Sequence, residues 1–294
     1  MRVLVAGASG FIGRALVEHL VRQGHDAVVL TRGSSTDPEV MIWDPARHQI
    51  DPAAMSGIDA VINLAGENIA AERWSGARRV RILKSRLDAT STLLEAARRA
   101  ARPPTLFLNA SAVGYYGNRG DENLTESASR GSGFLAEVCE AWETEAAKAV
   151  DFGARFVALR FGTVLAPGGG ALGKLLPIFR LGLGGRIGTG RQWMSWIHRE
   201  DAVGAIGHLL EHSAATGPVN LVAPAPVTNA EFTRALAKSL HRPAVLPVPA
   251  LALRAALGQL ADEALLSSTR ALPEQLLRTG FSFQYPTLDS ALQR

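Results

Sequence analysis

The first thirteen residues constrain the fold of this chain more than any other stretch. An apolar run over residues 3–6 stops at Gly7, and two more glycines follow at three-residue intervals, Gly10 and Gly13. An amphipathic helical pattern begins at Phe11. This order predicts a buried strand, a tight turn and the start of a helix.

Each glycine has a physical reason in such a turn. Gly7 can adopt a positive φ, Gly10 lets a diphosphate approach the backbone, and Gly13 lets the helix pack closely on the sheet. The unpaired N–H groups of the helix N-terminus favour an anion. The spacing is G-x-x-G-x-x-G, which differs from the commoner G-x-G-x-x-G. The motif therefore predicts a dinucleotide site, with a ligand-free tight turn as the alternative.

Strand and helix patterns alternate along the first half of the chain. The expected strands cover residues 3–6, 27–31, 40–43, 60–64, 105–110, 155–161 and, later, 218–222, and the expected helices cover 11–23, 78–101, 134–150 and 201–211. Such alternation predicts an α/β fold, a doubly wound parallel sheet of the Rossmann type with ligands at the carboxyl ends of its strands.

The pattern loosens after residue 166, where glycine-rich stretches and prolines interrupt it. We expect a flexible link at 167–170 and a capping box at Thr228–Glu231 ahead of a helix reaching residue 240. The predicted division is a dinucleotide-binding domain, 1–165, completed by segments around 196–222. The remaining residues, 166–195 and 223–294, would form a smaller substrate-side cap, with a C-terminal helical segment over 247–292.

Composition excludes several classes of protein. Hydrophobic residues make up 47% of the 294 residues and charged residues 20%, which is typical of a folded globular chain. Cys139 is the single cysteine, so neither an internal disulfide nor a cysteine-built metal site is expected, and no metal is predicted. No apolar run could span a bilayer, and no signal segment is visible, so a cytoplasmic protein is the simplest expectation.

Several longer strings resemble one superfamily. They are 7–13, 63–66, 86–97, 111–117 and 196–201, and together they resemble the extended short-chain dehydrogenase/reductases, which include nucleotide-sugar epimerases. The strings 65–69, 169–172, 179–185, 190–193 and 195–198 resemble more specifically an atypical epimerase-family subgroup with its own C-terminal cap. The resemblance implies NADP as cofactor and an oxidoreductase or epimerase-like reaction on an unidentified small polar substrate. It also implies a homodimer through the helices expected at 78–101 and 134–150.

The end of the second expected strand favours NADP over NAD. NAD-preferring members place an acidic residue there, whereas this chain has Thr31 and Arg32. The planar guanidinium of Arg32 suits a 2′-phosphate. The predicted cofactor-binding residues are Gly7, Gly10, Phe11, Ile12, Gly13, Thr31, Arg32, Leu64, Ala65, Gly66, Arg86 and Arg160. The resemblance places Arg86 at the ligand edge, with a solvated helix arginine as the alternative, and Arg160 lies there because it comes at the end of the strand expected at 155–161.

The catalytic residues pose a problem. The superfamily normally uses Y-x-x-x-K on one helix, where lysine lowers the pKa of the tyrosine, but here Leu135 and Cys139 hold those positions. A rearranged site could use Ser111 to bind a carbonyl and Tyr116 or His198 to carry a proton. The alternatives are that Ser111 satisfies backbone, that Tyr116 packs a pocket wall and, the reading we favour, that His198 caps the helix at Asp201.

Three functions follow from these observations. The first is an NADP(H)-dependent enzyme whose small-molecule substrate contacts Glu67, Asn68, Trp193 and His198, in a cleft whose many cations would favour an anion. The second is an NADP-bound sensor or interaction protein without turnover. The third uses the cation-rich stretch 73–86 to bind nucleic acid or a protein, although such runs are more often solvated helix surfaces.

Overall fold

The fold is built on one eight-stranded sheet, described here from a computed structural model that covers residues 1–33, 40–212 and 214–293. The strand order is β12-β8-β6-β5-β1-β2-β3-β4, and all pairings are parallel except that of β4 with β3. The strands are β1 (Arg2–Ala6), β2 (Asp26–Thr31), β3 (Val40–Asp44), β4 (Gln49–Ile50), β5 (Ala60–Asn63), β6 (Leu106–Ala112), β8 (Arg155–Phe161) and β12 (Gly217–Leu221). The predicted doubly wound parallel sheet is confirmed.

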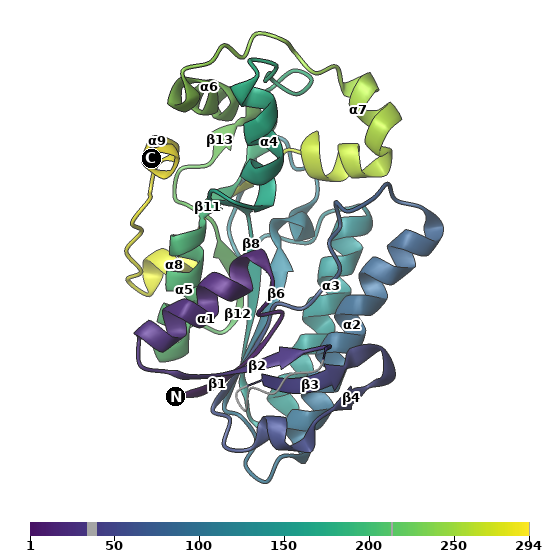
Figure 1. Cartoon of the computed structure of the whole chain (residues 1–294), viewed down its shortest axis with the longest axis vertical. Coiled ribbons are helices and arrows are strands. Elements are labelled where there is room, and N and C mark those ends of the chain that lie inside the picture. The colour runs from purple at the N-terminus through teal and green to yellow at the C-terminus, as the bar shows by residue number, and fades with distance from the viewer. Residues whose placement is uncertain (34–39, 213, 294) are drawn as a thin grey trace.

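Helices cover both faces of this sheet because its central strands are apolar on both sides. Val3 and Val5 face one core, and Leu4 and Ala6 face the other. The first core is covered by α1 (Phe11–Arg22) and α5 (Arg199–Glu211), and the second by α2 (Gly76–Arg99) and α3 (Phe134–Ala147). Figure 1 shows the two pairs on opposite sides of the sheet.

In the turn after β1, backbone segments come so close together at Gly7 and Gly13 that neither position has room for a side chain. A Cβ on Gly13 would lie 2.2 Å from the carbonyl oxygen of Gly7. Gly7 has φ +82°, and a Cβ there would lie 2.7 Å from the carbonyl carbon of Leu64, which follows β5. The glycines therefore bring strand, helix and the neighbouring β5 loop together at one point, as the sequence predicts.

A separate apolar core surrounds Trp196, which is fully buried. Three helices contribute to this core: α4 (Gly170–Arg180), α6 (Asn229–Leu240) and α9 (Leu288–Leu292). The capping box predicted at Thr228 and Glu231 is present at the start of α6. The prediction of a flexible link at 167–170 is wrong for its last residue, because α4 begins at Gly170. The ring of Phe11 lies against Gly169 and Gly170.

Segments from the second half of the chain return to the main sheet. β12 joins the main sheet, whereas β11 (Trp196–His198) pairs with β9 (Thr163–Leu165) in a separate ladder. The short helix α8 (Glu274–Arg278) packs against β12, and the buried carboxylate of Asp201 accepts hydrogen bonds from the backbone N–H groups of Gln284 and Tyr285. The C-terminal segment thus crosses from the cap to the sheet and back (Figure 1).

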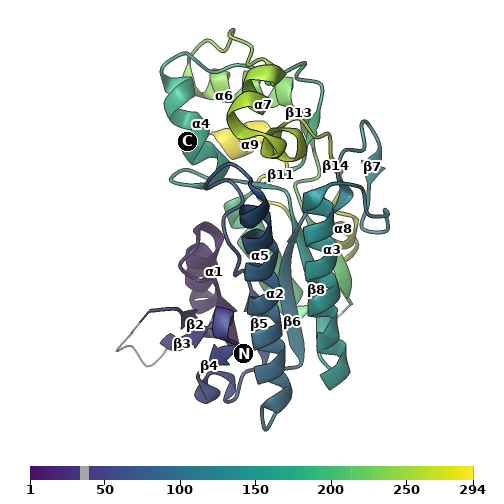
Figure 2. The same ribbon diagram turned by 90° about the vertical axis from the view of Figure 1, so that its right-hand side faces the viewer.

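One cap helix differs from the others in its packing. α7 (Ala250–Leu257) contains no buried residue, and Leu251 on it is 77% exposed. Figure 2 shows α7 facing the viewer above α2. The remaining short elements are β7 (Asn123–Leu124), β10 (Trp193–Met194), β13 (Val227–Thr228), β14 (Arg270–Ala271) and the single turns Pro45–Arg47, Pro52–Met55, Val113–Tyr116, Lys148–Phe152 and Ala261–Leu265. Within the described ranges, no helix is long and apolar enough to cross a membrane.

We expect Gly13→Ala to lower the free energy of unfolding by about 2 kcal/mol, because the added methyl group forces β1 and α1 apart. Gly76→Ala is the matched control: it opens α2, and a Cβ there meets nothing within 4 Å. Its stability should stay within about 0.5 kcal/mol of the wild type. Urea denaturation of both variants measures the difference, and equal stabilities would contradict the close approach.

Candidate functional site

The predicted cofactor residues on β1, β2 and β5 converge at the carboxyl edge of the sheet. In the parallel registers, Ala6 is paired with Leu30 and with Asn63, so the residues after these strands are neighbours. The backbone of Leu64 and Ala65 lies within 2.9 Å of the Cβ position of Gly7. Gly10 is exposed, and its Cβ position meets nothing within 4 Å except the Gly7 carbonyl oxygen. This leaves an open backbone surface at the N-terminus of α1.

The loop after β5 is fixed by a buried polar network. The amide of Asn63 donates to Asn109 Oδ1 at 2.7 Å and to Thr90 Oγ1 at 3.0 Å, while its oxygen accepts from the N–H of Ala65 at 3.1 Å. Trp142 donates to the same Thr90 hydroxyl. A fully satisfied buried network of this kind gives the loop one conformation.

Two of the predicted basic residues lie at this edge. Arg32, directly after β2, is exposed. Arg86 lies beneath the β5 loop: its Cζ is 3.2 Å from the Cβ position of Gly66, its Nη1 donates to the Glu67 carbonyl at 3.1 Å, and its guanidinium stacks on Trp142. Burial lowers the pKa of Arg86. Arg86 therefore supports the loop from below.

Arg160, near the end of β8, is engaged with other protein groups. It is 3% exposed, and its guanidinium makes two hydrogen bonds to the carboxylate of Glu143, at 2.8 and 2.7 Å. It also lies 3.5 Å from the ring centroid of Tyr115. Burial alone would lower the Arg160 pKa, but the bonds and charge of Glu143 outweigh it and raise that pKa. These contacts give Arg160 a structural role inside the protein, and its contact with the cofactor stays a prediction.

Tyr116 is also part of this buried network. It is fully buried, and its hydroxyl lies 2.8 Å from Asn220 Oδ1 and accepts from Arg160 Nη1 at 3.0 Å. Burial raises the Tyr116 pKa. This placement does not support the predicted proton transfer by Tyr116, because the hydroxyl is surrounded by protein groups; it favours the packing role that the sequence left open.

The two positions that normally carry tyrosine and lysine lie together on α3. Leu135 and Cys139 both approach Gly114, whose Cβ position is 3.3 Å from Leu135 Cβ and 4.0 Å from Cys139 Sγ. Burial, reinforced by the charge of Glu143, raises the pKa of Cys139 to about 11. Ser111, 3% exposed at the end of β6, donates to Glu143 Oε1 at 2.6 Å.

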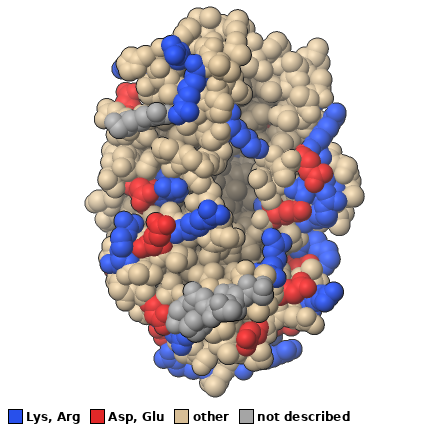
Figure 3. Space-filling view, viewed as in Figure 1, with Lys and Arg blue, Asp and Glu red and all other residues tan. Residues whose placement is uncertain are grey.

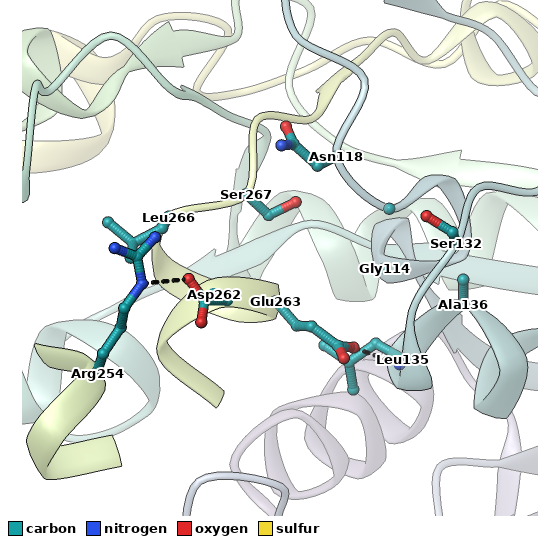
Figure 4. Close-up of a pocket in the computed structure, with 11 residues that line it drawn as sticks. Gly114, Asn118, Ser132, Leu135, Ala136, Arg254, Asp262, Glu263, Leu266 and Ser267 are labelled. Carbon is teal, nitrogen blue, oxygen red and sulfur yellow. Dashed lines mark hydrogen bonds and ion pairs between the residues drawn. The ribbon is translucent and has the colours of Figure 1, made fainter. Parts of the chain in front are cut away.

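A cavity of about 280 Å³ lies next to Leu135, between the N-terminus of α3 and the C-terminal segment. Figure 4 shows Ser132 and Ser267 on either side of one space, with Asn118 above and Glu263 below. Glu263 accepts from the N–H groups of Phe134 and Leu135 at 3.0 and 2.7 Å, and so caps α3. The lining of the cavity also includes Arg254, whose guanidinium is paired with the carboxylate of Asp262 at 2.8 Å.

The four predicted substrate residues lie outside this cavity lining. Glu67 pairs with Arg78 at 2.7 Å, and the side chain of Asn68 accepts from the N–H of Ala70 in a local turn. The indole of Trp193 donates to Asp121 at 2.7 Å. His198 accepts from the N–H of Glu200 and caps α5, as the favoured alternative had it, and burial lowers its pKa. The backbone N–H of Trp193 donates to the hydroxyl of Ser268, the residue after Ser267 of the cavity lining.

The cation-rich stretch does not form an open basic face. Its members are engaged within the described part of the chain: Arg73 with the carbonyl of Ala255, Arg78 with Glu67 and Glu72, Arg79 with Gln259, Arg81 with Glu72, Lys84 with Asp88 and Arg86 as above. Figure 3 shows one face of the molecule hollowed near its middle, with lysine, arginine and acidic side chains interspersed around the hollow. This argues against the nucleic-acid alternative. The described residues also hold no cluster of metal-ligating side chains.

Comparison with known proteins fits this geometry. A protein-family match covers residues 3–222, which contain the glycine turn and the main sheet except Arg2. The chain belongs to the NAD dependent epimerase/dehydratase family. Residues 248–294 match a second family, a domain of unknown function named DUF1731. The predicted resemblance to an epimerase-family subgroup with its own C-terminal cap is confirmed.

Full-length relatives support the same assignment. An epimerase family protein of Mycobacterium bovis is 47% identical over 290 residues, covering 99% of this chain and 96% of the relative. The crystal structure of the human epimerase family protein SDR39U1 with NADPH has a TM-score of 0.90 and 37% identity, covering 100% of this chain and 98% of that one. A nucleoside-diphosphate sugar epimerase from Corynebacterium glutamicum has a TM-score of 0.83 and 33% identity, covering 99% of this chain but 57% of that one.

Sequence reasoning missed two acidic residues of this region. Glu143 lies four residues after Cys139, so the helical period alone puts it on the same face of α3 as the Y-x-x-x-K positions. That signal was available in the sequence. Glu263 reaches α3 from the C-terminal segment, and no local pattern could have paired residues so far apart in the chain.

We expect the buried carboxyl of Glu126 to make stability depend on pH. Its Oε1 accepts from the N–H groups of Asn220 and Gln275, and burial raises its pKa above the ordinary 4.5. The folded protein therefore binds this proton more tightly than the unfolded chain, and the stabilisation is lost as the pH rises from 4.5 through the raised value.

The measurement is urea denaturation of wild type and Glu126→Gln between pH 4 and 8. The wild type should lose stability relative to the variant as the pH rises, because glutamine cannot ionise. Glu122→Gln, at an exposed carboxylate 2.7 Å from Arg119, is the control and should not show this trend. A constant difference between wild type and Glu126→Gln would contradict the prediction.

Proposed function

We propose that this chain is an NADP(H)-dependent oxidoreductase or epimerase-like enzyme that acts on a small polar substrate. The observation that carries the proposal is the open backbone at Gly10, set between the N-terminus of α1 and the β5 loop. A side chain there would obstruct a diphosphate, and the helix terminus supplies N–H groups to it. The NADPH bound in the human relative supports the same cofactor here.

Each part of the cofactor has a fitting group at this edge. Gly10 and the following N–H groups would hold the diphosphate, and exposed Arg32 would pair with the 2′-phosphate, for which a carboxylate at the end of β2 would be repulsive. The loop at 64–66, held by Asn63 and Arg86, would line the cofactor. When bound, NADP supplies hydride transfer; the protein supplies orientation and proton transfer.

The substrate would occupy the cavity beside Leu135. Its lining offers the hydroxyls of Ser132 and Ser267 and the amide nitrogen of Asn118, none of which has a hydrogen-bond partner among the described residues. The cation of this lining, Arg254, is neutralised by Asp262. These groups favour a small neutral, hydroxyl-bearing molecule over the anion that the sequence suggested.

A second candidate is an NADP-bound sensor without turnover. It is favoured by the replacement of the usual tyrosine and lysine by Leu135 and Cys139, and by the burial of Tyr116. The two candidates differ in one measurable respect. An enzyme oxidises NADPH when a suitable carbonyl compound is added, whereas a sensor binds NADPH tightly and leaves every carbonyl compound in a broad set unreacted.

We expect Arg32→Ala to weaken NADPH binding by about tenfold or more, because one charge-assisted contact to the 2′-phosphate is lost. Binding of NADH, which lacks that phosphate, should not change. Calorimetric titration with both cofactors gives the ratio of affinities. Arg99→Ala removes a similarly exposed arginine at the far end of α2 and should leave both affinities unchanged. An unaltered preference for NADPH in Arg32→Ala would refute the assignment.

The cavity chemistry predicts which ligands stabilise the NADP-bound protein. Small polyols and hydroxy-ketones should raise the melting temperature, and Ser132→Val or Ser267→Val should remove that shift while leaving the shift caused by NADPH. Carboxylates and phosphorylated analogues of the same size should have little effect. A larger shift with the anionic analogues would contradict the neutral-substrate proposal.

A further inference from the structure

One lysine joins α4 to the loop that follows β5. The ammonium group of Lys174, on α4, donates to the carbonyl oxygen of Ala70 at 2.9 Å. Ala70 belongs to the β5 loop, whose first residues, Leu64 and Ala65, pack against Gly7. The hydrogen bond therefore links a helix from the second half of the chain to the edge at which the cofactor is expected.

The position of α4 is fixed by Phe11, the first residue of α1. Cε1 of the Phe11 ring lies 2.9 Å from the Cβ position of Gly170, and the guanidinium of Arg199 lies 5.2 Å from the centroid of the same ring. Lys174 follows Gly170 by four residues, which is about 6 Å along a helix axis. Lys174 is thus one helical turn from the contact with α1, and Figure 1 shows α4 above the N-terminal end of that helix.

These contacts form a closed ring around the open backbone at Gly10. From Gly10 the ring passes through Phe11 to α4. It continues through Lys174 to Ala70 and returns along the β5 loop to Gly7. The Cβ position of Gly10 meets only the Gly7 carbonyl oxygen within 4 Å, so the ring leaves space above Gly10. A diphosphate bound to the N–H groups at the start of α1 would lie within this ring.

The charge of Lys174 is not neutralised within the described part of the chain. Its hydrogen-bond partner is a neutral carbonyl, and no described carboxylate forms an ion pair with it. By contrast, Lys84 and Lys148 each pair with a carboxylate, at 2.7 and 2.6 Å. An ammonium group has three N–H donors, so two remain for other acceptors. Anionic phosphate oxygens are stronger acceptors for it than a carbonyl oxygen.

We propose that Lys174 is a cofactor-binding residue, supplied by α4, that pairs with the diphosphate of NADP(H). The inference rests on the proposed function. Lys174 donates to the diphosphate and to the Ala70 carbonyl at the same time, so that α4, the β5 loop and the cofactor are joined through one ammonium group. Arg32 recognises the 2′-phosphate, which only NADP(H) carries, whereas Lys174 serves the part that NADPH and NADH share.

The first test is calorimetric titration of the full-length protein with NADPH and NADH. Lys174 is exposed, so replacing it leaves the apolar cores intact. Lys174→Met keeps the apolar stem and loses the charge, and it should weaken both dinucleotides by about tenfold. Adenosine 2′-monophosphate, which lacks the diphosphate, should bind as it does to the wild type when it competes with NADPH.

Two further substitutions separate the charge from the bridge to Ala70. Lys174→Gln can still donate to the Ala70 carbonyl but carries no charge, so it should lose as much affinity as Lys174→Met. Lys174→Arg keeps the charge and should recover most of the affinity. Lys238→Met is the matched control, because Lys238 is an exposed lysine on α6 that forms no ion pair with a described carboxylate. It should bind both dinucleotides like the wild type.

Wild-type affinity in Lys174→Met would overturn the inference. Wild-type affinity in Lys174→Gln would also overturn it, because the lysine would then act only as a bridge between α4 and the loop. Equal losses in the Lys238→Met control would reflect net charge alone and would count against it in the same way. If the wild type binds neither dinucleotide, the proposed function fails and the inference fails with it.

Amide hydrogen exchange gives a second readout that needs no turnover. NADPH should slow exchange in α4 of the wild type, because Lys174 ties this helix to the bound cofactor. In Lys174→Met saturated with NADPH, the β5 loop should still be protected, but α4 should exchange as it does without cofactor. Equal protection of α4 in both proteins would overturn the inference.

Discussion

The close approach of three backbone segments at Gly7 and Gly13 is the constraint on which the rest of the structure depends. It places the start of α1 directly on β1 and sets the β5 loop against the turn. These contacts decide where the carboxyl edge of the sheet is open and where it is filled. The open part is suited to an anionic dinucleotide, and everything that follows along β5, β6 and β8 is positioned relative to it.

Beyond this edge, the positions Leu135 and Cys139 are followed on α3 by a largely buried charge, that of Glu143. A tyrosine–lysine pair needs solvent or cofactor around it, whereas Glu143 and Arg160 neutralise each other within the protein. Separating such a pair would leave an uncompensated charge in a low dielectric, at a cost of several kcal/mol. The network through Tyr116 and Asn220 extends this requirement to β12 and the loop before α3. The region is therefore stable only as a whole.

Local patterns in the sequence were sufficient for the parallel sheet and for the glycine turn. The main strands and this turn follow from apolar runs and from backbone geometry, which act over a few residues. The placements of Arg160 and Tyr116 did not follow, because a strand-end position does not reveal a partner on another element. Glu143 and Glu263 are similar, because each contacts a residue on another element. The start of α4 at Gly170 was missed because glycines disfavour helices. The ring of Phe11 against Gly169 and Gly170, together with the positive φ of Gly170, accounts for their presence.

The poor burial of α7 has a consequence for the cavity that it borders. This helix loses little apolar contact when it leaves the surface, and its attachments are a few polar contacts such as that from Arg73 to the carbonyl of Ala255. Local opening should therefore cost far less than global unfolding, and its amide hydrogens should exchange early. The volume available to a ligand is then a property of an equilibrium between open and closed forms. For a ligand larger than the closed cavity, binding would then cost only the small additional free energy needed to displace α7.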